Sequence, residues 1–134
     1  MSEHTVGDAM TFGVLSVKAN AGLGEAVRLM DAYHVRGLAV VDGTGAVVGV
    51  ISQTDLVHAR VTEHLWDTWR GLAVRHLMTT PAVTAPTTMP LGEAARLMED
   101  KEIHRLIVVG EDGVTPLGVL STSDLIRDMA EARR

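Results

Sequence analysis

The sequence has no cysteine among its 134 residues, so it offers no disulfide framework, no thiolate metal site and no cysteine nucleophile. It also has no stretch approaching the roughly 20 apolar residues that a membrane-spanning helix needs. The first ten residues, MSEHTVGDAM, are polar and do not form a basic segment followed by an apolar one. We therefore predict a soluble, cytoplasmic protein with no membrane partner.

The sequence also lacks a cluster of lysine and arginine, and its formal net charge is -5. Binding to a phosphate backbone needs a basic surface, so we predict no nucleic-acid partner. A small anion could still bind at a local basic spot. The length suits one domain, which would bury about two-thirds of the surface of its unfolded chain.

What the sequence does contain is an internal repeat. LGEAVRLM at Leu23–Met30 returns as LGEAARLM at Leu91–Met98, and GVISQTDL at Gly49–Leu56 returns as GVLSTSDL at Gly118–Leu125. The second spacing is one residue longer, because the hairpin of the second copy carries an extra residue. The chain therefore consists of two similar units, and both are expected to take part in its function.

Each copy predicts the same order of elements. The apolar residues of the LGEA segments fall at i, i+3, i+4 and i+7, which is one face of a helix. Pro90 suits the first helical position of the second copy, and Gly37 lies just past the first helix. Two β-rich runs around a Gly/Asp turn then predict a hairpin, and helical spacing returns after it.

Short extended pieces are expected around residues 14–17 and 82–84, and an amphipathic connector over residues 62–75. The domain boundaries that we predict are about 6–61 for the first repeat, 62–73 for the connector and 74–130 for the second repeat. A lone unit is too small to cover its sheet. Two α/β units should therefore pack about a pseudo-two-fold axis, which makes the crevice between them twice.

The strongest local motif is Ser-x-x-Asp, which occurs at Ser52–Asp55 and at Ser121–Asp124, each time after a strand and at the start of a helix. One interpretation is a helix cap, in which the serine oxygen accepts a free backbone N–H. The other is a ligand site, because a helix N-terminus attracts phosphate and a carboxylate can accept two hydrogen bonds from vicinal ribose hydroxyls. The hydroxyls that suit phosphate are those of Ser52, Thr54, Ser121 and Ser123.

Basic residues enter the strands near these motifs: Arg36 occupies the position of His104, and Arg105 follows His104. Each could be a solvated residue at a strand edge. Together with a helix N-terminus they could complete an anion pocket, since a guanidinium pairs with phosphate in a bidentate fork. The second copy, with both His104 and Arg105, is the better anion candidate.

Other chemistry is not indicated. The six histidines include no pair at i, i+3 or i+4, so we predict no metal site. There is no phosphate-binding P-loop, no nucleophile elbow and no Ser-His-Asp pattern, so we predict no enzyme and no catalytic residues. Trp66 and Trp69 could form a docking stripe, but we favour contact with their own core or a dimer partner.

The element order, the double G-h-h-S-x-[ST]-D motif, in which h is an apolar residue, and the HRLIVV run resemble a tandem pair of cystathionine beta-synthase (CBS) domains. Such a pair is called a Bateman module. The resemblance covers about Val6 to Met129. It implies that each unit is a small three-stranded sheet with two helices. It also implies that adenosine derivatives such as AMP, ADP or ATP bind in the two crevices, with no further cofactor required.

The resemblance assigns roles to individual residues. Asp55 and Asp124 would hold the ribose hydroxyls. The phosphates would meet Ser52, Thr54, Ser121, Ser123, Arg36, His104 and Arg105. The adenine would rest against Ala82 and Val83 in the Asp55 site, and against Val14 and Leu15 in the Asp124 site. Many members that bind nucleotide have proline where Ala39 and Ile107 stand here.

Two functions remain in competition. The first is a non-catalytic regulatory module that senses an adenosine nucleotide and alters contacts with a regulated protein. The alternative is a constitutive assembly module in which the Ser and Asp residues are only helix caps. In either case the resemblance implies a homodimer.

Overall fold

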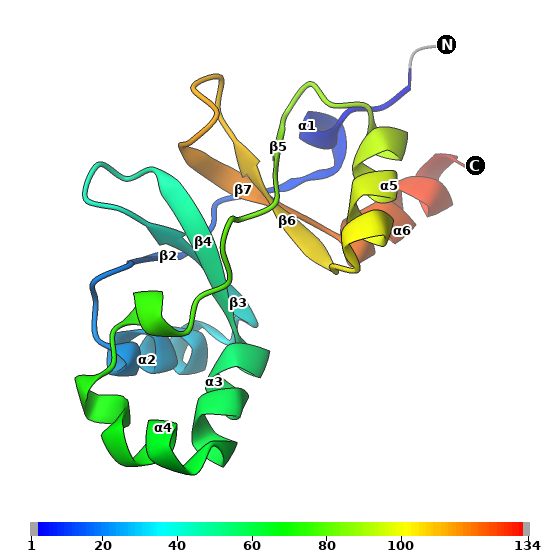
Figure 1. Cartoon of the computed structure of the whole chain (residues 1–134). Coiled ribbons are helices and arrows are strands. Elements are labelled where there is room, and N and C mark those ends of the chain that lie inside the picture. Colours follow the sequence, from blue (N-terminus) through cyan, green and yellow to red (C-terminus); the bar gives the residue numbers. More distant parts are fainter. Residues whose placement is uncertain (1–2, 133–134) are drawn as a thin grey trace. The chain divides into compact units, whose positions relative to one another are not determined.

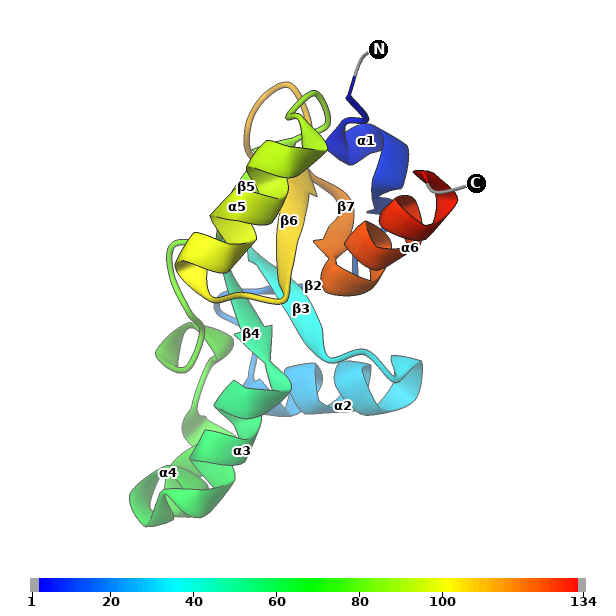
Figure 2. The same cartoon turned by 90° about the vertical axis from the view of Figure 1, so that its right-hand side faces the viewer.

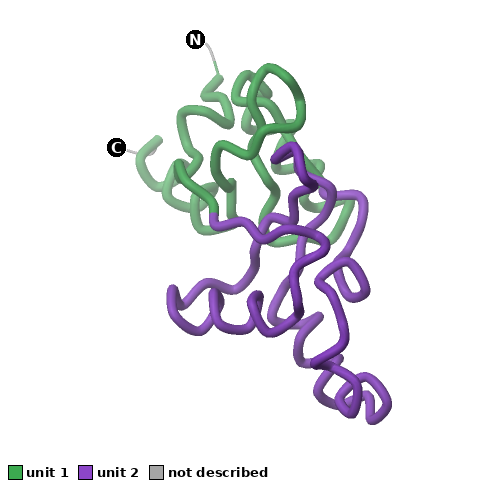
Figure 3. Tube along the Cα trace, turned by 90° about the vertical axis from the view of Figure 1, so that its left-hand side faces the viewer, with its two compact units in different colours: residues 1–14, 83–134 green, residues 15–82 purple. Residues whose placement is uncertain are grey.

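The computed structural model describes residues 3–132, which form a mixed α/β fold with two compact units (Figures 1 and 3). Unit 1 combines residues 3–14 with residues 83–132, and unit 2 consists of residues 15–82. The predicted α/β class is confirmed. The units cut across the two sequence repeats, because the opening segment of each repeat packs in the same unit as the rest of the other repeat.

Unit 2 has a three-stranded sheet in the order β2-β3-β4, with β2 parallel to β3 and β3 antiparallel to β4. Its strands are β2 (Ser16–Lys18), β3 (Gly37–Val41) and β4 (Val47–Ser52). Its helices are α2 (Leu23–Tyr33), α3 (Gln53–Val61), α4 (Glu63–Thr68) and the 3-10 turns η1 (Trp69–Gly71) and η2 (Val74–His76). The predicted helix, hairpin and second helix of the first repeat are confirmed.

Unit 1 has a four-stranded sheet in the order β1-β7-β6-β5. Its strands are β1 (Thr11–Phe12), β5 (Thr84–Pro86), β6 (Arg105–Val109) and β7 (Pro116–Ser121). Its helices are α1 (Val6–Ala9), α5 (Leu91–Lys101) and α6 (Thr122–Ala132), which Figure 2 shows gathered around this sheet. Strand β1 adds a fourth strand to the three expected, by pairing antiparallel with β7.

The predicted helix faces form the two cores. In α2, Leu23, Ala26 and Met30 are buried against the sheet of unit 2, and the equivalent residues of α5 are buried in unit 1. Both hairpins carry a β-bulge at the same place, after Val40 and after Val108. Because these helix residues and the buried strand residues belong to the same hydrophobic clusters, the spacing that recurs in the two repeats reflects packing.

Some predicted boundaries are wrong. Pro90 is the residue before α5 and not its first residue, so its fixed φ serves the cap. Gly37 opens β3, and the chain leaves α2 at His34 with a left-handed φ of 54°. The extended pieces lie about two residues later than expected, because regular pairing starts only where β2 and β5 meet the central strands.

The glycine of each G-h-h-S motif allows a close approach of the chain. At Gly49 of β4, a Cβ would lie 2.7 Å from the carbonyl oxygen of Thr79. At Gly118 of β7, a Cβ would overlap the carbonyl oxygen of Thr11. Thr11 and Thr79 occupy equivalent places in the two repeats. In each unit, therefore, the equivalent segment of the chain lies against the second strand of the hairpin.

The connector forms α4 and η1, and Leu65 of α4, Trp69 of η1 and Leu72, which follows η1, pack against the unit 2 core. The ring centroids of Trp66 and Trp69 are 5.6 Å apart and stacked, and Trp66 remains 40% exposed. The amphipathic interpretation is therefore confirmed for Trp69, which contacts its own core. None of the helices within residues 3–132 is long and apolar enough to cross a membrane.

Candidate ligand-binding site

The start of α3 is built by a reciprocal cap between Ser52 and Asp55. The Ser52 backbone N–H donates to Asp55 Oδ2 at 2.8 Å, and the Asp55 N–H donates to Ser52 Oγ at 3.3 Å. The Ser52 hydroxyl also donates to Asp55 Oδ2, at 3.1 Å. The helix-cap interpretation is confirmed here, and it engages only one of the two carboxylate oxygens.

The start of α6 repeats this cap at Ser121 and Asp124, with the corresponding distances 2.8, 3.2 and 3.0 Å. Here the other oxygen, Asp124 Oδ1, is engaged as well. It accepts from the Thr11 hydroxyl at 3.2 Å and from the Arg127 guanidinium. Arg127 also donates to the carbonyl oxygen of Ala9 at 3.4 Å, so α6 is fixed to the N-terminal segment of unit 1.

Asp124 is 3% exposed, and among residues 3–132 it is the only polar or charged residue that is buried. Burial by itself would raise the pKa of Asp124. Hydrogen bonds from the Ser121 backbone, from Arg127, and from the Ser121 and Thr11 hydroxyls outweigh burial and lower the pKa below its ordinary value. The carboxylate therefore stays ionised inside unit 1. Asp55, by contrast, is half-buried.

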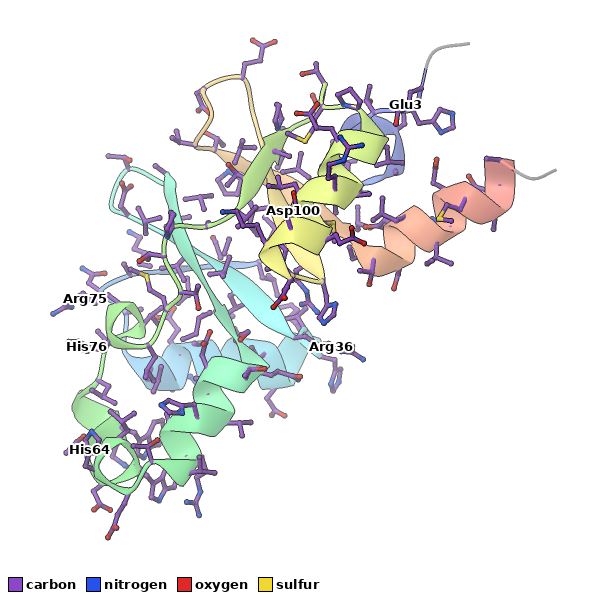
Figure 4. All side chains as sticks on the ribbon, turned by 45° about the vertical axis from the view of Figure 1, so that its right-hand side comes forward. Glu3, Arg36, His64, Arg75, His76 and Asp100 are labelled. Atoms are coloured by element: carbon purple, nitrogen blue, oxygen red, sulfur yellow. The ribbon has the colours of Figure 1, made fainter. Side chains whose placement is uncertain are left out.

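The backbone places the predicted basic residues at these helix starts. The carbonyl oxygen of Arg36 accepts from Gln53 N–H, and that of His104 accepts from Thr122 N–H, both at 3.0 Å. In the sheet register, Arg105 lies opposite Ser121. Arg36 and His104 are exposed and Arg105 is half-buried; Figure 4 shows Arg36 projecting outward from the start of β3.

The remaining predicted residues divide between the units. The hydroxyl residues Thr54 and Ser123 lie exposed in the first turns of α3 and α6. Leu15 belongs to the unit of Asp55, where its carbonyl oxygen accepts from Ala39 N–H at 3.0 Å. Val83 belongs to the unit of Asp124, where its carbonyl oxygen accepts from Ile107 N–H at 3.1 Å. Val14 lies in unit 1 and Ala82 in unit 2.

Sequence reasoning missed Thr11 and Arg127. Arg127 follows Asp124 by three residues in a predicted helix, a spacing at which side chains meet, so this pair could have been found. Thr11 could not, because it contacts Asp124 across 113 positions of sequence. Two shallow depressions, of about 440 and 280 Å³, lie around Lys18 and Asn20, and none of the predicted site residues lines them.

Among residues 3–132, no three His, Cys, Asp or Glu side chains gather in a way that could hold a metal ion. A separate contact pairs two such side chains, with His4 Nδ1 lying 2.7 Å from Asp128 Oδ1. That carboxylate raises the pKa of His4, first through the hydrogen bond and then through its charge. The pair joins the N-terminal segment to α6.

These features define a class of protein: a duplicated β-α-β-β-α unit with a Ser-x-x-Asp cap at the start of the helix that follows each hairpin. The CBS domain model matches the chain twice, at residues 6–62 and 74–131. The chain therefore belongs to the CBS domain family and carries two CBS domains in tandem.

Several proteins resemble the whole chain. The crystal structure of CBSX2 in complex with AMP superposes with a TM-score of 0.83 at 30% identity, covering 98% of this chain and 99% of that one. A second CBSX2 structure, from Arabidopsis thaliana, gives a TM-score of 0.86. The CBS domain-containing protein YhcV of Bacillus subtilis is 30% identical over 129 residues, covering 94% of this chain and 89% of YhcV.

Other relatives are longer than this chain. The chain is 26% identical to the uncharacterized protein MJ1404 of Methanocaldococcus jannaschii over 144 residues, and it spans 34% of that protein's length.

Proposed function

We propose that this chain is a non-catalytic regulatory module that binds an adenosine nucleotide, with the ribose held by the Ser-x-x-Asp carboxylates. The observation that carries the proposal is the likeness to CBSX2, a CBS-pair protein solved with AMP, at 30% identity over nearly the full length of both chains. Tandem CBS pairs are generally regulatory, and this chain keeps both motifs of the family in the expected places.

The local chemistry supports a nucleotide. At the start of α3, Asp55 offers a carboxylate, Thr54 an exposed hydroxyl and Arg36 an exposed guanidinium. Backbone N–H groups in the first turn add a positive partial charge, which favours phosphate. A carboxylate for the sugar beside hydroxyls and a cation for the phosphate is the combination that a ribonucleotide needs.

A thermal-shift panel of AMP, ADP, ATP, NAD and S-adenosylmethionine tests the proposal. A ligand that binds only the folded chain raises its apparent stability by mass action, and the increase is about 2.7 kcal/mol at a hundredfold excess over Kd. We expect adenosine phosphates to raise the melting temperature. No shift with any member of the panel would refute the proposal and favour the constitutive assembly module.

We also propose that the chain forms a homodimer in the cytoplasm and acts on a regulated protein. Helix α6 supports the dimer, because Ile126 and Met129 are 63% and 61% exposed on it. Exposed apolar residues gathered on one helix favour association with another surface. Light scattering that gives only the 14.3 kDa mass of one chain at micromolar concentration would refute the dimer.

A further inference from the structure

The two Ser-x-x-Asp motifs are alike in sequence, but their carboxylates differ in how many hydrogen-bond acceptor positions remain. An ionised carboxylate has about four acceptor positions, two on each oxygen. At Asp124, Oδ2 accepts from the Ser121 backbone and hydroxyl, and Oδ1 accepts from Thr11 and Arg127. All four positions of Asp124 are therefore occupied by the protein itself.

At Asp55 only half of these positions are occupied. Oδ2 accepts from the Ser52 backbone and hydroxyl, while Oδ1 has no hydrogen-bond partner among residues 3–132. The two free positions on Oδ1 match the two O–H groups of a vicinal diol. A ribose can thus bind Asp55 without breaking a bond of the protein.

The two carboxylates differ because the residues around them differ between the two repeats. The position of Arg127 in the second copy is held by His58 in the first, and His58 makes no hydrogen bond with Asp55 in the described chain. Thr11 has Thr79 as its counterpart, and each pairs with the equivalent strand residue, Val119 or Val50, but no hydrogen bond joins the Thr79 hydroxyl to Asp55 in the described chain. The chain has therefore built a clamp of Thr11 and Arg127 on one carboxylate and not on the other.

From this, and resting on the proposed nucleotide-binding function, we propose that the two sites are unequal. Asp55 is the primary ribose site, and Asp124 binds a ribose only when Arg127 and Thr11 release it. Arg127 is thus a positioning residue that lowers the nucleotide affinity of the second site. The chain fills its sites in a fixed order as nucleotide concentration rises, and so responds over a wider range than two equal sites would allow.

The basic residues alone would suggest the opposite order, since the second copy has both His104 and Arg105 and the first has Arg36. His104 and Arg36, however, are exposed and Arg105 is half-buried, and ion pairs of side chains that keep contact with water contribute little to affinity. Hydrogen bonds to an ionised carboxylate contribute more. The carboxylates therefore decide the order of filling.

The test is calorimetric titration of the full chain with AMP and with 2′-deoxy-AMP. For the wild type we expect two classes of AMP site that differ at least about tenfold in affinity, the ratio that one charge-assisted hydrogen bond supplies. Asp55→Asn should remove the tighter class together with its preference for AMP over 2′-deoxy-AMP. Asp124→Asn should change the tighter class by less than about threefold.

The role of Arg127 is tested in the Asp55→Asn background, where the titration measures nucleotide binding at the second site alone. Arg127→Gln should raise AMP affinity there about fivefold or more and should increase the preference for AMP over 2′-deoxy-AMP, whereas Arg127→Lys should restore the wild-type values. The matched control is His58→Gln in the Asp124→Asn background, which should leave AMP binding unchanged. A purely structural role for Arg127 would not move the sugar preference.

The outcomes distinguish a failure of the proposed inequality between the sites from a failure of nucleotide binding itself. If Asp55→Asn keeps the tighter class, or if Arg127→Gln leaves the sugar preference of the second site unaltered, the inequality is refuted while nucleotide binding stands. If the wild type binds neither nucleotide, the proposed function is refuted as well. Should Asp124→Asn fail to fold by circular dichroism, Asp55→Asn and the Arg127 variants still decide the question.

Discussion

The unequal capping of α3 and α6 predicts that equivalent substitutions in the two repeats cost different amounts of stability. Asp55→Ala removes the carboxylate half of the reciprocal cap of α3, while Ser52, the N-cap, still accepts the backbone N–H of residue 55, so we expect a loss of about 1 kcal/mol or less, the typical cost of losing an N-cap. Asp124→Ala removes the same cap and, in addition, the bonds to Thr11 and Arg127. A hydrogen bond to a charged group contributes about 1.5 to 3 kcal/mol.

Two effects reduce that additional cost. The Arg127 side chain is 55% exposed, so it regains water when its partner is removed, and ion pairs of this kind contribute about 0 to 1 kcal/mol. Burying the Asp124 carboxylate also costs free energy that alanine does not incur. We therefore expect Asp124→Ala to lower the free energy of unfolding by about 2 to 3 kcal/mol, against about 1 kcal/mol for Asp55→Ala.

Urea denaturation followed by circular dichroism measures both values. Thr11→Val supplies a control, because it keeps the shape of the side chain and removes only the hydroxyl that donates to Asp124; it should cost about 1 kcal/mol. Equal costs for Asp55→Ala and Asp124→Ala, within about 0.5 kcal/mol, would contradict the clamp of Thr11 and Arg127.

Four further outcomes are expected. Gly118→Ala should be among the most destabilising single changes, because its Cβ would meet the Thr11 carbonyl, and Gly49→Ala should cost less because the contact with Thr79 is longer; denaturation midpoints compare the two. Trp69→Ala should cost about 2 to 3 kcal/mol and Trp66→Ala about 1, since Trp69 packs on the unit 2 core while Trp66 is 40% exposed. The raised pKa of His4 means that its pairing with Asp128 stabilises the fold fully below the unfolded value of about 6.5 and ceases to do so as pH rises through the folded value; His4→Ala should abolish that pH dependence of the unfolding midpoint. Excess chelator should leave AMP titrations unchanged, and loss of all binding would point to a metal-bridged phosphate.

The elements that sequence predicts well here are those with strong local periodicity. The faces of α2 and α5 and the two hairpins follow from residues that are neighbours in sequence. Strand β1 could not be predicted, since Thr11–Phe12 is only two residues long and is a strand only because β7 lies beside it. The same holds for α1, whose four residues are stabilised by burial of Val6 and Ala9.

The candidate site shows the same division. The Ser-x-x-Asp caps are local, and the motif alone predicts their hydrogen bonds. Half of the clamp on Asp124 is also local, because Arg127 stands three residues after Asp124 where the first copy has His58; the other half depends on Thr11, which is distant in sequence and which no local pattern indicates. Duplication makes the two copies look equivalent, and they differ in the residue three positions after each aspartate and in the hydroxyl of Thr11 that tertiary packing brings to Asp124.

Nucleotide binding through the carboxylates is the central claim, and one titration tests it most directly. The wild-type chain and the double variant Asp55→Asn/Asp124→Asn, each shown to be folded by circular dichroism, are titrated with AMP and with 2′-deoxy-AMP. The wild type should bind AMP at least about tenfold more tightly than 2′-deoxy-AMP, and the double variant should lose most of that preference. Equal binding of the two nucleotides by the wild type, or full preference kept by the double variant, would contradict the claim.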